Sequence, residues 1–175
     1  MAIDAFRRVD DLLGRGEDIF LAASHGVVAT LIIAAVFFRY VLNDPLVWTE
    51  EFVVITFTWM LFIGLASGFR YRMHIRIDAL LIALPHKGRA MVGAVAVAAT
   101  LFILILLAWF GTTETLVMLE TETPMMRISA AWAVSAVPVG AVLSCIHLLR
   151  HALCDGLAET LWPNDLVASA EGEAL

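Results

Sequence analysis

Apolar residues fill four long stretches of the chain, and the charged residues are confined to the segments between them. The uncharged stretches cover residues 19–38, 52–69, 90–113 and 128–149, which together hold 84 of the 175 residues. About 20 apolar residues in a helix, rising 1.5 Å each, cross a hydrocarbon layer of roughly 30 Å. The pattern predicts an all-α membrane protein with four spanning helices, over about 19–39, 45–69, 88–113 and 128–150.

The segment before the second apolar stretch carries helix-start signals. Asp44 followed by Pro45 has the form of an N-cap and a first-turn proline, so this helix is predicted to begin at Pro45. Glu50 and Glu51 would then lie in its first two turns, where the positive end of the helix dipole favours carboxylates. We expect residues 1–155 to form a single membrane domain, followed by a flexible tail over 156–175.

The distribution of basic residues predicts the orientation. Nine of the eleven lie in the N-terminal segment, in the loop between the second and third stretches, or just after the fourth: Arg7, Arg8, Arg15, Arg70, Arg72, Arg76, Lys87, Arg89 and Arg150. The other two loops hold only Arg39 and Arg127. The positive-inside rule therefore places both termini of this multi-pass protein in the cytoplasm.

The loop over residues 73–84 has its own pattern. Ile77, Leu80 and Leu81 recur at helical spacing, with His74, Arg76 and Asp78 opposite them. This predicts a short amphipathic helix at the cytoplasmic interface. His74 and Asp78 share a helical face but lack an adjacent nucleophile or metal cluster, so a structural or partner-contact role is favoured over catalysis.

Small residues at four-residue spacing predict close helix contacts, within the bundle or with another subunit. They are Gly64 and Gly68 in the second helix, Ala94 and Ala98 in the third, and Ala136, Gly140 and Ser144 in the fourth. Pro138 is expected to kink the fourth helix for packing.

The composition is 61% apolar and 16% charged, with a net charge of -6 and two cysteines. It argues against a nucleic-acid-binding protein, a disulfide scaffold and a cytosolic enzyme. No catalytic motif, metal-ligand set or cofactor motif is recognisable, so the chain is not expected to be an enzyme.

Two alternatives remain open from the residues alone. His25 and His147 could face each other across the bundle and ligate a b-type haem, which would make the chain a membrane electron carrier. A self-contained small transporter is the other alternative, although an uncharged interior offers no clear solute path.

Arg39 and the pair Glu50 and Glu51 bracket the short first outer loop. Arg39 is expected to reach one of the two carboxylates at the membrane boundary, with Trp48 anchoring the cluster.

The same residues carry a resemblance to a known family. RYVLN at 39–43, WTEE at 48–51, GLASGFR at 64–70, HIRID at 74–78, and the later Thr123-Pro124 and Pro138-Val139-Gly140 steps resemble the small permease subunit, of DctQ type, of tripartite ATP-independent periplasmic (TRAP) transporters. The resemblance implies a scaffold for a large permease subunit in sodium-coupled uptake of a solute, with an organic acid expected. A periplasmic binding protein would deliver the solute. The sequence does not identify the solute, and it contains no recognisable sodium-binding residues.

Overall fold

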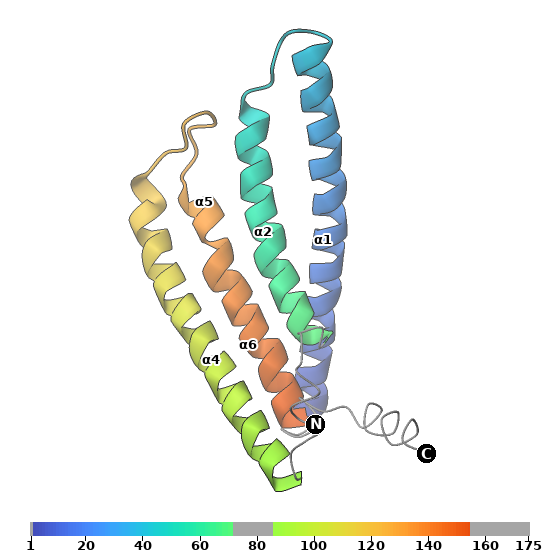
Figure 1. Ribbon diagram of the computed structural model, residues 1–175, viewed down its shortest axis with the longest axis vertical. Helices are drawn as coiled ribbons and strands as arrows, with labels where there is room; N and C mark the ends of the chain where they lie inside the picture. The colour runs from blue at the N-terminus through green and yellow to red at the C-terminus, as the bar shows by residue number, and fades with distance from the viewer. Residues whose placement is uncertain (1, 72–85, 155–175) are drawn as a thin grey trace.

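The computed structural model describes residues 2–71 and 86–154 (Figure 1). Four of its helices are long and apolar enough to cross a membrane: Arg8–Tyr40, Trp48–Arg70, Met91–Glu120 and Ala131–Leu153. The predicted all-α architecture with four spans is therefore confirmed. The predicted interfacial helix with His74, Arg76 and Asp78, and the predicted tail 156–175, lie outside the described residues.

The helices differ from the predicted ranges mainly at their ends. Their bounds are α1 (Ala2–Tyr40), α2 (Trp48–Arg70), α4 (His86–Val117) with its 3-10 continuation η1 (Met118–Glu120), α5 (Ala131–Val134) and α6 (Ala136–Cys154). At 39 residues, α1 is about 58 Å long, nearly twice the hydrocarbon thickness. The apolar run locates only its membrane-crossing part, because a helix can continue into water with charged residues on its exposed face.

One face of α1 points inward along its whole described length. Residues 10, 14, 17, 21, 24, 28 and 31 are buried or half-buried at alternating spacings of four and three. This 3.5-residue period is that of a coiled-coil seam, in which a straight apolar stripe keeps facing a partner helix. The first three of these positions are Asp10, Gly14 and Glu17, so the inward-facing positions near the start of the chain include two carboxylates.

The predicted start of the second helix at Pro45 is wrong. The helix begins at Trp48, its N-cap residue is Val47, and no side chain caps it. Asn43 has a φ of 51°, and Pro45 disfavours a helical conformation for the residue before it, so the chain turns here before the helix starts. Glu50 and Glu51 still lie in the first turn, where the helix dipole favours them.

The fourth span is interrupted at Ser135, between α5 and α6. Pro138 has no backbone N–H to donate to the carbonyl of Val134, and this loss accounts for the break. Side chains bond to the nearby carbonyl of Trp132: the Ser135 hydroxyl donates to it at 3.0 Å, and Trp59 Nε1 of α2 donates to it at 2.8 Å. Trp59 therefore has a polar partner in the middle of the apolar region.

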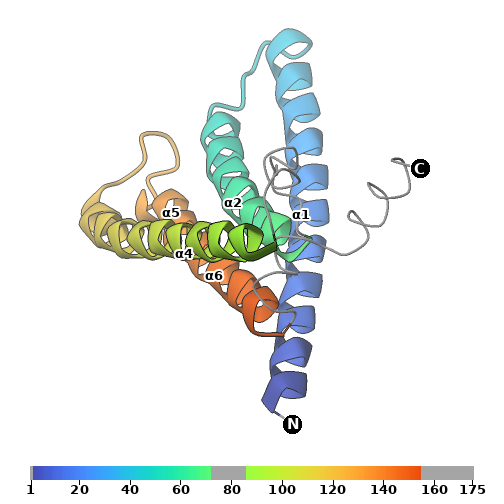
Figure 2. The same cartoon turned by 60° about the horizontal axis from the view of Figure 1, so that its bottom comes forward.

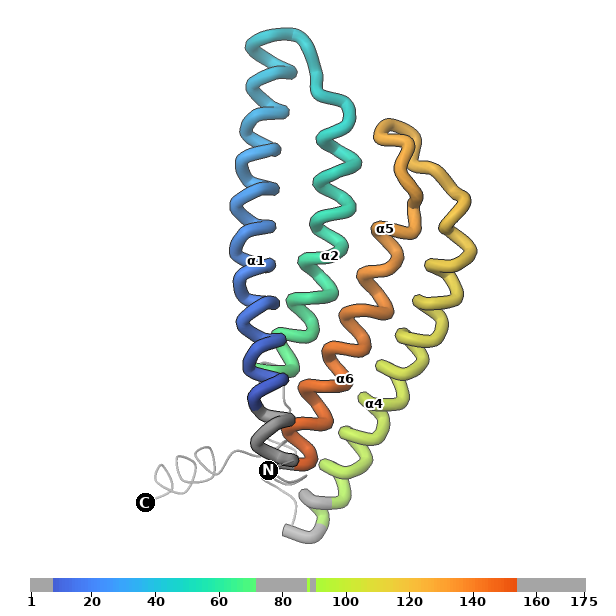
Figure 3. Tube along the Cα trace, turned by 180° about the vertical axis from the view of Figure 1, so that it is seen from behind, coloured from blue at the N-terminus to red at the C-terminus, as the bar shows by residue number. Residues whose placement is uncertain are grey.

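The four long helices form a single row in the order α1, α2, α6, α4 (Figure 1). The same order is seen from behind in Figure 3, and Figure 2 shows that α4 is inclined to α1. Both loops, 41–47 and 121–130, lie at one end of the row, which we call the hairpin end. The start of α1 and the end of α6 lie at the other, which we call the terminal end (Figure 3).

Small residues let the central helix α6 approach its neighbours closely. A Cβ atom on Gly140 would lie 2.7 Å from the carbonyl oxygen of Phe62 in α2, and one on Gly111 of α4 would lie 2.9 Å from Pro138 Cδ. Ala136 and Ser144 are fully buried on the same face of α6 as Gly140. A Cβ on Gly64 would make only an ordinary contact, with Leu21 at 3.9 Å, and Gly68 is half-buried. Ala94 and Ala98, in contrast, lie on an exposed face of α4.

Candidate functional site

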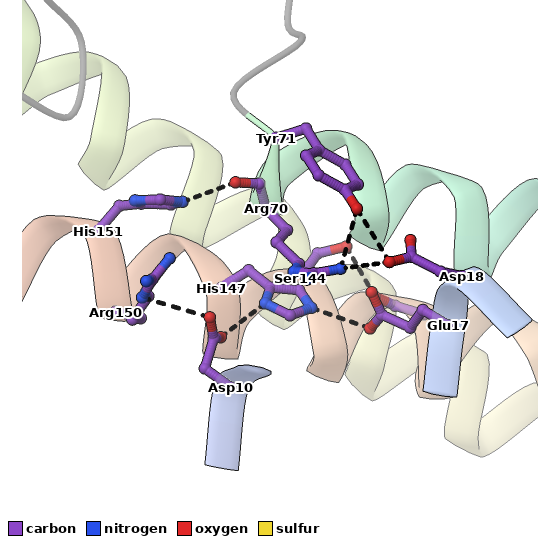
Figure 4. A network of polar contacts seen from close by, with 10 residues as sticks. Asp10, Glu17, Asp18, Arg70, Tyr71, Ser144, His147, Arg150 and His151 are labelled. Carbon is purple, nitrogen blue, oxygen red and sulfur yellow. Dashed lines mark hydrogen bonds and ion pairs between the residues drawn. The ribbon is translucent and has the colours of Figure 1, made fainter. Parts of the chain in front are cut away.

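Polar side chains from three helices meet at the terminal end of the row (Figure 4). We call this group the terminal network; it consists of Asp10, Glu17 and Asp18 of α1, Arg70 of α2 with Tyr71 directly after it, and Ser144, His147, Arg150 and His151 of α6. Asp10, Ser144 and His147 have no exposed surface, and Glu17 and His151 are each 5% exposed. Charged groups buried this deeply require partners, and each of these carboxylates has at least one. Among the described residues, Asp10 Oδ2, Glu17 Oε2 and Arg150 Nε are buried without a hydrogen bond.

His147 lies between two carboxylates of α1. Its Nδ1 is 2.7 Å from Asp10 Oδ1, and its Nε2 is 2.9 Å from Glu17 Oε1. When both carboxyl groups are ionised they can only accept hydrogen bonds, so both ring nitrogens then donate and the ring is a positively charged imidazolium. The two carboxylates are seven residues apart on one face of α1, so His147 fits between them from the neighbouring helix.

Two arginines complete the terminal network. Arg150 Nε lies 3.3 Å from Asp10 Oδ2, and Arg70 Nη1 donates to Asp18 Oδ2 at 2.9 Å. With His147 charged, the three cations balance the three carboxylates, so the network is formally neutral. This balance lowers the cost of keeping the charges away from water.

Tyr71 and Gly14 shape the Arg70 site. The Tyr71 hydroxyl donates to Asp18 Oδ2 at 2.9 Å, and this bond to a carboxylate raises the pKa of Tyr71 above its ordinary value. The Arg70 guanidinium lies where a side chain on Gly14 would be, 2.1 Å from the position of its Cβ. The His151 ring donates from Nε2 to the Arg70 carbonyl at 3.0 Å, so α2 and α6 are joined directly as well.

The structure argues against the alternative of a haem held by His25 and His147. Both nitrogens of His147 are engaged by carboxylates, so neither is available to iron. His25 lies on an exposed face of α1, and its Nδ1 is bonded to the Leu21 carbonyl at 2.7 Å. In the described part of the chain, no group of three or more His, Cys, Asp or Glu side chains is placed to hold a metal ion.

At the hairpin end, Arg39 and Glu50 form an ion pair between the end of α1 and the start of α2. Their side chains are 50% and 67% exposed, so the pair is far more open than the terminal network. An apolar groove of about 260 Å³ lies beside it, between α1 and α2. Trp48 packs edge-on against Phe52, one turn further along α2, and its anchoring of the pair stays a prediction.

Glu51 has a different partner from Glu50. Its Oε2 accepts hydrogen bonds from the backbone N–H groups of Met125 and Met126, at 3.2 and 2.6 Å. These residues are at the tip of the loop 121–130, which folds back on itself through bonds between Thr123 and Ile128 and between Thr121 and Ala130. Glu51 thus joins the two hairpins of the row, whereas Glu50 joins α1 to α2.

Sequence reasoning missed most of the terminal network. It considered His147 only as a ligand in the alternative haem site, and it assigned no contact to Asp10, Glu17 or Asp18. The available signal was the spacing of Asp10, Gly14 and Glu17, which continues the inward positions of the apolar seam into the charged segment. A polar residue at a seam position predicts a specific buried partner.

Comparison with known proteins identifies the family. Residues 28–157 match the family model described as tripartite ATP-independent periplasmic transporters, DctQ component. The chain is 34% identical over 102 residues to the C4-dicarboxylate TRAP transporter small permease protein DctQ of Vibrio cholerae, and 27% identical over 138 residues to that of Rhodobacter capsulatus. These matches cover 58% and 78% of the chain but only 44% and 60% of the two relatives.

A third relative is larger. The chain is 25% identical over 120 residues to the sialic acid TRAP transporter permease protein SiaT of Haemophilus influenzae, covering 69% of the chain and 20% of that protein. The match of the family model extends over most of the four spans seen in the structure. The resemblance noted in the sequence is thereby confirmed, and the chain belongs to the DctQ component family of tripartite ATP-independent periplasmic transporters.

Proposed function

We propose that this chain is the small membrane subunit of a TRAP transporter and acts as a scaffold for a larger permease subunit. The observation that carries the proposal is the single row of helices in a member of this family (Figure 1). A row has two faces and encloses no interior. A polar solute needs an enclosed, partly polar path through the hydrocarbon, and in this assignment another subunit provides it.

The terminal network supports a rigid scaffold. It fixes the start of α1 to α6 and α2 with hydrogen-bonded charges, and Glu51 joins α2 to the loop 121–130 at the opposite end. Links at both ends hold the two helix hairpins in one arrangement. A subunit that stays fixed while a neighbouring subunit carries the solute requires this kind of stiffness.

The terminal end is assigned to the cytoplasm and the hairpin end to the periplasm of the bacterial inner membrane. The basis is the basic residues, which concentrate in the segments at and beyond the terminal end. In this orientation Arg39, Trp48, Glu50 and Glu51 face the periplasm and contribute to a surface on which a binding protein docks. His74, Arg76 and Asp78 would contact lipid headgroups or the larger subunit on the cytoplasmic side.

The solute is proposed to be an organic acid taken up with sodium. The relatives named above are called C4-dicarboxylate and sialic acid transporter proteins, and both solutes are carboxylic acids. SiaT, of which this chain matches a fifth, further supports a larger permease as the partner.

Affinity purification from native membranes in mild detergent, followed by mass spectrometry and an absorption spectrum, tests the proposal. We expect a larger polytopic protein to co-elute in stoichiometric amount. Elution of the chain alone would contradict the scaffold role, and solute flux through the purified chain in vesicles would favour a self-contained transporter instead.

The docking surface is tested by the charge swap Arg39→Glu with Glu50→Arg, which keeps an ion pair but reverses its direction. Because the pair is exposed, the swap costs little in the pair itself, but each swapped charge then opposes a helix dipole, so the melting temperature should fall by a few degrees at most. We expect it to slow uptake that depends on the binding protein while the larger subunit still co-elutes. Unchanged uptake would mean that this pair is not part of the docking surface.

A further inference from the structure

His25 is an ionisable residue on an outward face of a membrane span. It is six residues, or about 9 Å, inside the uncharged run that starts at Ile19. Its Nδ1 is bonded to the Leu21 carbonyl, which holds the ring against the preceding turn. Within residues 2–71 and 86–154, its Nε2 has no partner. Ionisable groups at such depth normally face protein or a water-filled cavity, not lipid.

No contact within the described residues explains why the next position, 26, is a glycine. A Cβ atom at this position would meet no atom within 4 Å, whereas the glycines at 111 and 140 are required by close packing against other helices. A glycine in an exposed helix is unfavourable compared with alanine. Its presence in a spanning helix is explained where a second helix approaches the backbone closely.

These two residues belong to one stripe, which we call the His25 face and define as Ala22, His25, Gly26, Ala29 and Ile33. All five are exposed. The exposed side of α4, at the other end of the row, carries large apolar residues in its second half, among them Phe102, Ile103 and Trp109, which are 62%, 55% and 71% exposed. Its exposed alanines, among them Ala94 and Ala98, have no ionisable residue in the same uncharged run. Large apolar side chains suit lipid, whereas small residues beside a hydrogen-bonding ring suit a helix.

We propose that the His25 face is the surface that receives a membrane-spanning helix of the larger permease subunit. The partner helix approaches the backbone at Gly26 and presents a hydrogen-bond acceptor, such as a hydroxyl or a backbone carbonyl, to His25 Nε2. The proposal rests on the scaffold function above and specifies which edge of the row carries the contact. It makes α1 the shared edge and leaves the outer face of α4 to lipid.

Site-specific photocrosslinking in the intact transporter tests the proposal. A benzophenone amino acid is placed at Ala29 on the His25 face, or at Ala98 as the matched control. Both are exposed alanines, ten and eight residues inside the uncharged runs that start at residues 19 and 90. We expect a crosslink to the larger subunit from position 29 and none from 98. A crosslink from 98, no crosslink from 29, or a crosslink from 29 to a second copy of this chain would each overturn the proposal.

The same purification separates this proposal from the function on which it rests. If the larger subunit co-elutes with the wild-type chain but position 29 does not crosslink to it, the scaffold function stands and the His25 face is wrong. If no larger subunit co-elutes, both are wrong.

The hydrogen bond is tested by His25→Leu and His25→Gln. Hydrogen bonds between membrane helices correspond to roughly three- to twentyfold in association. We expect His25→Leu to weaken recovery of the larger subunit by a factor in this range and His25→Gln, which retains a donor, to restore it. Both variants should leave the melting temperature of the isolated chain unchanged. Recovery of the larger subunit by His25→Leu at the wild-type level would overturn the role of the imidazole.

Discussion

Replacing His147 with leucine tests whether the terminal network stabilises the fold. The substitution is close in size but removes both donors that hold Asp10 and Glu17. Asp10 keeps Arg150 as an ion-pair partner, whereas Glu17, whose side chain is 4% exposed, loses its bond to the ring. Removing one member of a buried charged pair costs about 3–5 kcal/mol, because the remaining charge is left without compensation.

This cost predicts a large change in thermal stability. At about 2–4 °C per kcal/mol for a chain of this size, His147→Leu should lower the melting temperature by roughly 6–20 °C. Tryptophan fluorescence of the purified chain in detergent reports the transition, since the chain has five tryptophans. His25→Leu is the matched control, because it makes the same exchange at an exposed position and should have no effect.

A double variant separates loss of charge compensation from loss of packing. Glu17→Leu combined with His147→Leu removes the stranded carboxylate, so the double variant should melt at a higher temperature than His147→Leu alone. The reasoning is refuted if His147→Leu melts within about 2 °C of wild type, or if adding Glu17→Leu lowers the melting temperature further.

Two further predictions concern other contacts. Glu51→Ala removes the acceptor of the Met125 and Met126 amides. Hydrogen bonds to a charged group contribute about 1.5–3 kcal/mol, so hydrogen exchange at these two amides should accelerate by roughly tenfold or more. Glu50→Ala is the control, and equal exchange rates in the two variants would contradict the assignment. Gly140→Ala brings a methyl group against the Phe62 backbone and should cost about 1–3 kcal/mol, whereas Gly16→Ala meets open space and should stabilise α1 by up to about 1 kcal/mol. Melting temperatures that do not differ between these two variants would show that the close approach of α2 and α6 relaxes freely.

The number of spans could be predicted from the sequence because the bilayer imposes a simple rule on length and polarity. The ends of the helices could not be predicted in this way, because a helix that extends into water is not limited to a fixed length or to apolar residues. The helix α1 continues through charged residues to Ala2, and the start of α2 depends on the turn around Asn43 and Pro45. At the hairpin end, the pairing of Arg39 with a glutamate followed from their closeness in the chain. The separate role of Glu51 did not, because its partners are 74 and 75 residues away.

The terminal network was harder to predict for the same reason. His147 is 137 residues from Asp10 and 130 from Glu17. The sequence around His147 does not indicate that it contacts the start of α1, and the sequence around Asp10 and Glu17 does not indicate a contact with α6. The order of helices in the row decides which ends meet, and that order comes from packing at Gly140 and Gly111.

The distance in sequence between these partners has a consequence for biosynthesis. At roughly 5–20 residues per second, a ribosome needs about 7–26 s after Glu17 to reach His147, and during that time Asp10 and Glu17 cannot reach their final partner. The start of α1 therefore stays in contact with water until the last span has been inserted. The contact between His147 and the two carboxylates can form only after the last span has been synthesised. In a chain whose synthesis stops earlier, the first segment of α1 stays accessible to proteases.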